Sequence, residues 1–157
     1  MKFRLTFFVI FAFSVAMITS CGKDKSGYWD QEMQNDIDKK LIEDYAAANN
    51  LEGTFTQSGL YYVIADTGGV DKPSSTSKIS VQYKGYYLDG VSFDEGDLTD
   101  TYISNLIAGW QEGILLIGKG GKIKLIIPSY LGYGHTPPKG VRADAVLVFD
   151  IELKDFL

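Results

Sequence analysis

The stretch from Leu106 to Gly134 constrains the fold more than any other part of the chain, because its hydrophobic period changes midway. Its first half carries apolar residues at helical spacing, which predicts a short helix that packs by one face. Its second half alternates apolar residues with lysine, which predicts a half-buried strand that Pro128 ends. The apolar positions are Ile107, Trp110, Ile114 and Ile117 in the helix, and Ile123, Leu125 and Ile127 in the strand.

Two glycines and two tyrosines complete this stretch. Gly109 and Gly113 flank the apolar stripe and predict that another backbone approaches the helix closely. The loop after Pro128 carries Tyr130 and Tyr133. A large aromatic residue on a short helix, followed by a strand and a tyrosine-bearing loop, predicts a small apolar pocket with a few polar groups at its rim.

The rest of the chain reads mainly as strands. Alternation and β-branched residues predict strands over 60–65, 79–84 and 91–94, and a last strand over 147–153. Asp89-Gly90 is typical of a hairpin turn. The acidic segment 95–101 reads as a loop, followed by a short strand at Tyr102-Ile103. Many strands, one central helix and no alternation of strand and helix predict an α+β fold, an antiparallel sheet wrapped around one short central helix.

The composition is that of an ordinary globular protein. Of the 157 residues, 45% are hydrophobic and 22% are charged, and the formal net charge is −5. An acidic chain without a dense Lys/Arg cluster argues against nucleic acid as a partner.

The N-terminus predicts a targeting segment over residues 1–20. Lys2 and Arg4 precede an apolar run from Leu5 to Ile18, which is shorter than a membrane span and suits a signal peptide. Cys21 is the only cysteine, so the chain has no intrachain disulfide. Its position resembles a bacterial lipoprotein box, which implies cleavage before Cys21, a diacylglyceryl group on its sulfur, and an acyl chain such as palmitate on its amine. The alternative is an ordinary secretory signal with an incidental cysteine.

Residues 21–52 form a polar tether and then an N-terminal helix over 28–50. Large side chains recur every fourth residue along this helix, and acidic residues gather in its first half, where they suit the positive end of the helix dipole. The helix is short enough to be marginal alone in water, so we expect it to dock on its own domain; self-association is the alternative. The recurring residues are Trp29, Met33, Ile37, Leu41 and Tyr45, with Ile42 and Ala48 beside them.

Few side chains are available for covalent or metal chemistry. His135 is the only histidine and Cys21 the only cysteine, so neither a metal site nor a Cys–His or Ser–His–Asp nucleophile has candidates. No nucleotide-binding glycine motif is present, and no cofactor is expected. An enzyme of this composition needs a chemistry that uses few ionisable groups.

Five sequence motifs, taken in order, resemble the FKBP-type peptidyl-prolyl cis–trans isomerases. The motifs are Tyr83-Lys-Gly, Phe93-Asp94 after Asp89-Gly90, Gly109-Trp110 with Gly113, Pro128-Ser129 leading to Tyr133-Gly134, and Leu147 to Leu153. The resemblance runs from about Gly59 to Leu157 and implies an FKBP-like domain over residues 53–157. It implies proline-containing polypeptides as substrates and macrolides as inhibitors. Together with the lipoprotein box, it implies a lipid-anchored protein that assists protein folding in the cell envelope, either in the periplasm or on the outer membrane. Since some secreted members of the family dimerise through N-terminal helices, a homodimer is the corresponding alternative for residues 28–50.

The resemblance also implies a site. Trp110 would form the floor under the proline ring, Ile107 would offer its backbone N–H to a substrate carbonyl, and Asp94 would lie beside the carbonyl that twists. Core packing is the alternative role for each apolar member. The implied catalytic residues are Asp94, Tyr83 and Tyr133, and the implied substrate-binding residues are Phe93, Leu106, Ile107, Trp110, Val141 and Phe149.

Three departures from the family pattern bear on this site. The segment from Asp94 to Leu106 is shorter than in the compact members of the family, and none of its residues can be matched to the aromatic that usually closes one side of the pocket. Asn105 stands where a longer acidic or amide side chain is common, and Arg142-Ala143 replaces a pair of prolines. Two functions remain open: a prolyl isomerase, and a catalytically weak module that uses the same pocket to hold extended chains or a partner.

Overall fold

The computed structural model describes residues 30–157, so the signal peptide expected over 1–20 and the lipid site expected at Cys21 lie outside the described residues. Among residues 30–157, no helix combines the length and hydropathy needed to cross a bilayer. The helices and strands are α1 (Gln31–Ala48), β1 (Thr54–Phe55), β2 (Tyr61–Asp66), β3 (Lys78–Tyr87), β4 (Ser92–Tyr102), α2 (Ala108–Gly113), β5 (Lys122–Ile127) and β6 (Leu147–Phe156), and the 3₁₀ turns are η1 (Ile103–Asn105), η2 (Ile114–Leu116) and η3 (Ser129–Leu131).

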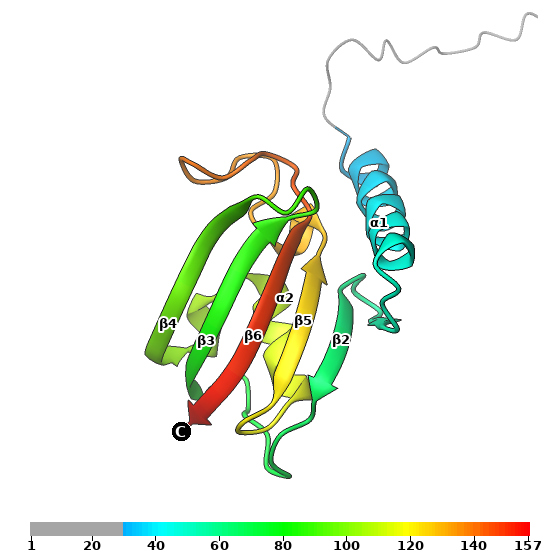
Figure 1. The fold of residues 1–157 in the computed structure, drawn as a ribbon. Helices are drawn as coiled ribbons and strands as arrows, with labels where there is room; N and C mark the ends of the chain where they lie inside the picture. Colours follow the sequence, from blue (N-terminus) through cyan, green and yellow to red (C-terminus); the bar gives the residue numbers. More distant parts are fainter. Residues whose placement is uncertain (1–29) are drawn as a thin grey trace, which may run out of the picture.

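The strands form one antiparallel sheet with the order β1-β2-β5-β6-β3-β4. Figure 1 shows α2 behind this sheet and α1 beyond its β2 side. The arrangement confirms the predicted α+β fold, with an N-terminal helix, an antiparallel sheet and a short helix packed on it.

The main core lies between α2 and the face of the sheet that α2 covers, here called the inner face. A Cβ atom added to Gly109 would lie 2.6 Å from Ile127, and one added to Gly113 would lie 2.5 Å from Leu125. These distances show that α2 packs closely on β5, but the atoms that the glycines meet belong to side chains and not to the backbone that was predicted. Fully buried members of this core include Leu60, Ile79, Val81, Ile114, Ile117, Leu125, Ile127 and Leu153.

Helix α1 packs on the other, outer face of the sheet, as expected, but through a different set of side chains. Its buried residues are Asp38, Ile42 and Ala46, which lie in successive turns. Ile42 packs with Tyr61 of β2 and Val148 of β6. Three members of the predicted stripe, Met33, Ile37 and Leu41, are all more than 40% exposed. Tyr45 of the stripe packs against the cluster that holds Ile42, and Trp29 lies outside the described residues. The helix therefore has two apolar faces. Ile42 and Ala46 lie on the docked face, and Met33, Ile37 and Leu41 lie on the exposed face.

The ends of α1 follow from its sequence. Asp30 begins the helix, and its Oδ1 accepts hydrogen bonds from the backbone N–H groups of Glu32 and Met33. The helix ends before Asn50, which has a φ of 52°, and the N–H of Leu51 returns to the carbonyl of Ala46. The proposed division of the chain between residues 52 and 53 stays a prediction.

The loop predicted over 95–101 and the strand predicted at Tyr102-Ile103 are wrong. Residues 95–102 belong to one continuous strand, β4, which ends at Tyr102, and Ile103 begins η1. Pairing with β3 along almost its whole length outweighs the low strand propensity of the acidic residues. The short predicted strand 91–94 was the beginning of β4.

Other element boundaries differ by smaller amounts. The central helix is shorter than the apolar stripe predicted, since α2 ends at Gly113 and η2 continues the turn. The last strand is longer and runs to Phe156, because it pairs with β3 as far as Ile79. Strand β1 pairs with β2 and adds a short strand at that edge of the sheet.

Candidate functional site

A pocket of about 260 Å³ opens on the inner face of the sheet, between α2, the strands β3, β4 and β6, and the loop after η3. The three strands bring residues that are far apart in sequence to its wall, while α2 supplies its floor. The residues that line it are Tyr83, Asp94, Leu98, Asn105, Leu106, Ile107, Trp110, Tyr133 and Phe149.

Three aromatic rings from three elements meet in this pocket. The ring centroid of Trp110 lies 5.3 Å from that of Tyr83 and 5.2 Å from that of Phe149, and both pairs are edge-to-face. Such pairs hold the rings in fixed orientations and contribute more than their buried area alone. Trp110 is 3% exposed, and its indole nitrogen has no hydrogen-bond partner among the described residues. The floor of the pocket is therefore a buried aromatic surface whose rings hold one another in place.

Hydroxyl groups and one carboxylate form a polar side of the pocket. The hydroxyl of Tyr83 donates a hydrogen bond of 2.9 Å to Oδ2 of Asp94. Burial raises the pKa of Tyr83 to about 12, and the hydrogen bond to the Asp94 carboxylate adds to the rise. Burial also raises the pKa of Tyr133, and the negative charge of Asp94 adds to the rise. Both hydroxyls therefore keep their protons at neutral pH; the Tyr83 hydroxyl donates to Asp94, and that of Tyr133 remains available as a donor.

The entrance to α2 places a backbone donor at the pocket wall. Ile107 has extended backbone angles (φ −61°, ψ 151°) and is the N-cap residue directly before α2. The first N–H groups of a helix have no partner within it, so that of Ile107 is free of the helical ladder. Gln111 fixes the approach to this turn, because its Nε2 donates a 2.7 Å hydrogen bond to the carbonyl of Leu106.

The structure gathers seven of the nine residues that the sequence suggested for the site. Phe93 lies one layer behind the wall, with its ring centroid 5.5 Å from that of Phe149. Val141 does not line the pocket and lies in the loop between η3 and β6, where its N–H donates to the carbonyl of Pro138. The seven lining residues are Tyr83, Asp94, Leu106, Ile107, Trp110, Tyr133 and Phe149.

Leu98 and Asn105 were not predicted as site residues, although both line the pocket. Leu98 lies on β4, four residues after Asp94, on the same side of the strand, and packs against the main core. The alternation of Asp94, Gly96 and Leu98 was the available signal, and the interpretation of 95–101 as a loop concealed it.

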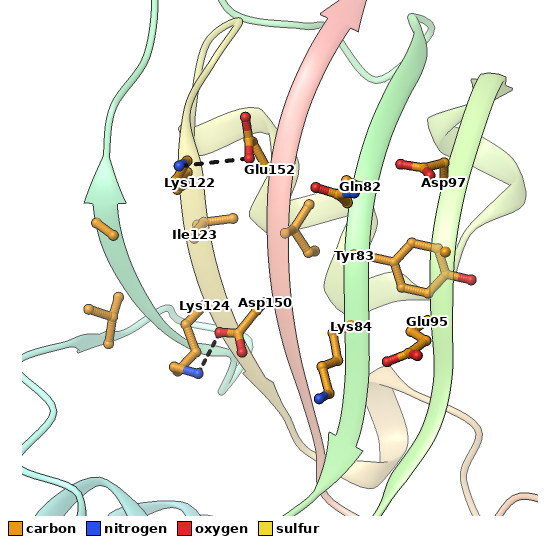
Figure 2. A pocket seen from close by; sticks show the side chains of 14 residues that line it. Gln82, Tyr83, Lys84, Glu95, Asp97, Lys122, Ile123, Lys124, Asp150 and Glu152 are labelled. Atoms are coloured by element: carbon orange, nitrogen blue, oxygen red, sulfur yellow. Dashed lines mark hydrogen bonds and ion pairs between the residues drawn. The ribbon is translucent and has the colours of Figure 1, made fainter.

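A larger hollow of about 680 Å³ lies on the outer face of the sheet. Figure 2 shows charged side chains along its strands, with Lys122 directed toward Glu152 and Lys124 toward Asp150. These cross-strand pairs bring opposite charges together, and the hollow lacks the cluster of aromatic rings that the smaller pocket holds. We therefore place the candidate site in the smaller pocket, where aromatic rings and neutral hydroxyls converge. Within residues 30–157, His, Cys, Asp and Glu side chains form no group of three suited to a metal ion.

Comparison with known proteins points to one family. The family model described as FKBP-type peptidyl-prolyl cis-trans isomerase matches residues 69–154. A protein of Buchnera aphidicola named FKBP-type peptidyl-prolyl cis-trans isomerase FkpA is 44% identical over 105 residues, which are 64% of this chain and 42% of that protein. The Escherichia coli K12 protein of the same name is 36% identical over 121 residues, which are 74% of this chain and 44% of that protein. The chain thus spans less than half the length of these curated relatives.

Solved structures agree with this result. The crystal structure of FkpA from Escherichia coli has a TM-score of 0.69 at 32% identity, and the match covers 80% of this chain and 62% of that one. AtFKBP13 has a TM-score of 0.59 at 30% identity and covers 66% of this chain and 98% of its own. A peptidyl-prolyl isomerase from Pseudomonas syringae, at 23% identity and a TM-score of 0.69, shares the fold over 82% of this chain and 97% of its own.

Proposed function

Because the chain belongs to the FKBP-type peptidyl-prolyl cis–trans isomerase family, we propose that it catalyses rotation about X–Pro peptide bonds in other polypeptides. Amide resonance sets a barrier of about 18–20 kcal/mol to this rotation. Uncatalysed X–Pro bonds consequently interconvert over tens to hundreds of seconds, slowly enough to limit folding. A catalyst needs only to bind the twisted amide more tightly than the planar one.

The observation that carries this proposal is the set of edge-to-face contacts that Trp110 makes with Tyr83 and Phe149 at the pocket floor. A twisted amide has lost the charge separation of its resonance form, so a dry aromatic surface favours it over the planar amide. The proline ring lies on Trp110 in this mechanism.

Polar groups at the pocket wall orient the substrate chain around the twisted bond. The N–H of Ile107 and the hydroxyl of Tyr133 donate to substrate carbonyls, while Asp94, held by Tyr83, lies beside the carbonyl that rotates. No bond to the protein forms, and no proton is transferred in the slow step.

A proline-limited refolding assay with a matched pair of variants tests the proposal. Wild-type protein should accelerate the slow refolding phase, and Trp110→Leu should lose most of the acceleration. Tyr102→Phe should match wild type, because Tyr102 is exposed at the end of β4, outside the pocket. Peptide binding without any acceleration would contradict catalysis and favour the binding module.

We further propose that the protein works outside the cytoplasm, attached to a membrane of the cell envelope through lipid on Cys21. The support is the position of this lone cysteine directly after a signal-like apolar run. Two or more acyl chains give stable anchoring, whereas a single chain binds only marginally.

We also propose that two copies associate through α1. The supporting observation is the stripe of Met33, Ile37 and Leu41, which stays exposed after the opposite side of α1 has docked. Sedimentation should show a dimer that Ile37→Glu converts to monomer, because a charge in an apolar contact is costly. As a control, Glu43→Gln changes an exposed residue of the same helix and should leave the mass unchanged. A monomeric wild type would contradict this proposal.

A further inference from the structure

Asp38 is a buried carboxylate that the proposed mechanism does not use. It is 0% exposed, and among the described ion pairs none involves it. A buried charge without a cation is costly unless hydrogen bonds satisfy it. Its position on the docked face of α1 could have been filled by an apolar side chain, as at Ile42 and Ala46 one and two turns later.

Both oxygens of Asp38 accept hydrogen bonds, one of them from a distant segment. Gln34 Nε2 donates to Oδ1 over 2.8 Å, within α1 itself. The backbone N–H of Ser129, in η3, donates to Oδ2 over 2.7 Å. Ser129 is 1% exposed, so this N–H has no access to solvent and depends on Asp38. A charged acceptor makes the bond stronger than a neutral one would.

Ser129 in turn holds the backbone on both sides of Tyr133. Its carbonyl accepts hydrogen bonds from Gly132 N–H (3.0 Å) and from Gly134 N–H (2.9 Å). The two donors are the neighbours of Tyr133 in the chain, and Tyr133 lines the pocket. A continuous set of hydrogen bonds therefore joins α1 on the outer face to the pocket on the inner face.

The charge of Asp38 also acts on Tyr130, the next residue of η3. Burial raises the pKa of Tyr130, the residue after Ser129, and the negative charge of Asp38 is the next cause, followed by that of Glu112. The hydroxyl of Tyr130 donates to the carbonyl of Ser58 over 2.6 Å, which holds η3 on its other side.

We propose that Asp38 is a positioning residue for Tyr133: it holds Ser129, and Ser129 fixes the backbone that aims the Tyr133 hydroxyl into the pocket. The kinetic part of this inference rests on the proposed isomerase function, whereas the structural part does not. Helix α1 thereby acts on the pocket without contacting substrate.

Three variants separate positioning from simple docking of the helix. Asp38→Leu removes the acceptor and leaves the Ser129 N–H unpaired. Asp38→Asn keeps an oxygen for Ser129, since the Gln34 carboxamide can rotate to match it. Ile42→Val weakens docking of the same helix face but leaves the hydrogen bond intact. Thermal unfolding of each variant confirms that the protein is folded at the assay temperature.

Amide hydrogen exchange reads the structural part without using activity. In Asp38→Leu, the N–H groups of Gly132 and Gly134 should exchange at least about tenfold faster, because their common acceptor is no longer held. In Asp38→Asn and Ile42→Val they should exchange as in wild type. Unchanged exchange in Asp38→Leu, or equal acceleration in Ile42→Val, would overturn the inference even if the protein proved to have no isomerase activity.

A double-mutant cycle with Tyr133→Phe reads the kinetic part. In the wild-type background, Asp38→Leu should lower kcat/KM for a short X–Pro peptide by about three- to tenfold, the effect of losing one oriented hydrogen bond. In the Tyr133→Phe background the same change should cost less than about twofold, because the hydroxyl it positions is already absent. Equal losses in the two backgrounds would show that Asp38 acts on stability alone. An inactive wild type would instead contradict the proposed function.

Discussion

At the scale of single residues, Tyr83 shows how burial sets the chemistry of the pocket. Its ring packs edge-to-face on Trp110, and its hydroxyl bonds to Asp94. Burial and this carboxylate raise its pKa to about 12, so the group stays a neutral donor over the whole physiological range. The residue thus contributes an oriented hydrogen bond and no titrating charge.

The first prediction concerns pH. Since the pKa of Tyr83 is raised to about 12 and that of Tyr133 is also raised, kcat/KM should be nearly flat from about pH 6 to about pH 9, unlike the bell of general acid–base catalysis. Steady-state assays on a short X–Pro peptide measure this. A steep dependence would show that a titrating group takes part.

The same shift has a consequence for stability. The pKa of Tyr83 is higher in the folded than in the unfolded chain, so its contribution is complete below about pH 10 and is lost as the pH rises toward about 12. Absorbance titrations of wild type and Tyr83→Phe should differ by one tyrosine that ionises above the usual range, because the pKa of Tyr83 is raised. A Tyr102→Phe control should keep it.

A second prediction separates the ring of Tyr133 from its hydroxyl. Tyr133→Phe should cost about 0.5–1.5 kcal/mol in kcat/KM, the range for one hydrogen bond. Tyr133→Ala should cost more, because it also opens the pocket wall to water. Peptide kinetics for both variants give the comparison, and equal losses would mean that the hydroxyl has no role.

At the scale of elements, the sequence predicted the helices and strands whose apolar residues are strongly periodic. It missed the strand whose formation depends on pairing with a neighbouring strand. The alternation around Ile123 and Leu125 correctly placed β5, and the glycines of α2 correctly indicated close packing. Strand β4 was missed because its acidic residues resemble a loop, and only pairing with β3 makes them a strand. Leu98 of the pocket was hidden by the same error.

Helix α1 shows a further limit of periodicity. Spacing finds apolar residues but does not say which of two apolar faces meets the sheet. The hydrogen bond from Ser129 N–H to Asp38 and the packing of Ile42 decide this, and both depend on residues far away in the sequence. The three aromatic rings that meet in the pocket were predicted together from motif resemblance, not from spacing.

A third prediction compares two isoleucines of α1. Ile42 is fully buried, whereas Ile37 is 46% exposed. Ile42→Ala should lower the free energy of unfolding by about 2–5 kcal/mol through lost burial and a cavity. Ile37→Ala should change it by less than about 0.5 kcal/mol in a monomeric sample. Denaturant unfolding measures both, and similar losses would contradict the docking of α1 seen here.

At the scale of the whole molecule, the two faces of the sheet have separate tasks. The inner face and α2 build the pocket, while the outer face receives α1 and displays paired charges. Asp38 and Ser129 connect the two sides. A lipid on Cys21, a tether and α1 would follow each other along the chain, so the proposed anchor leads directly into the helix that supports the pocket.

The fourth prediction tests that anchor. Cys21→Ser should move the protein from the detergent phase to the aqueous phase in a detergent partition experiment, because no acyl chains can be attached. Metabolic labelling with palmitate should mark wild type only. If wild type and variant partition alike, the cysteine is incidental and the segment is an ordinary secretory signal.

Strand β4 forms an outer edge of the sheet and exposes the carboxylates of Asp94, Glu95, Asp97 and Asp100. An open edge is a template on which another extended chain can add a strand. A protein that handles unfolded polypeptides would meet such chains constantly, and a sticky edge would trap them in shared aggregates. The row of negative charge makes this edge a poor template, so a polypeptide bound in the neighbouring pocket, as proposed, would not be retained by strand addition.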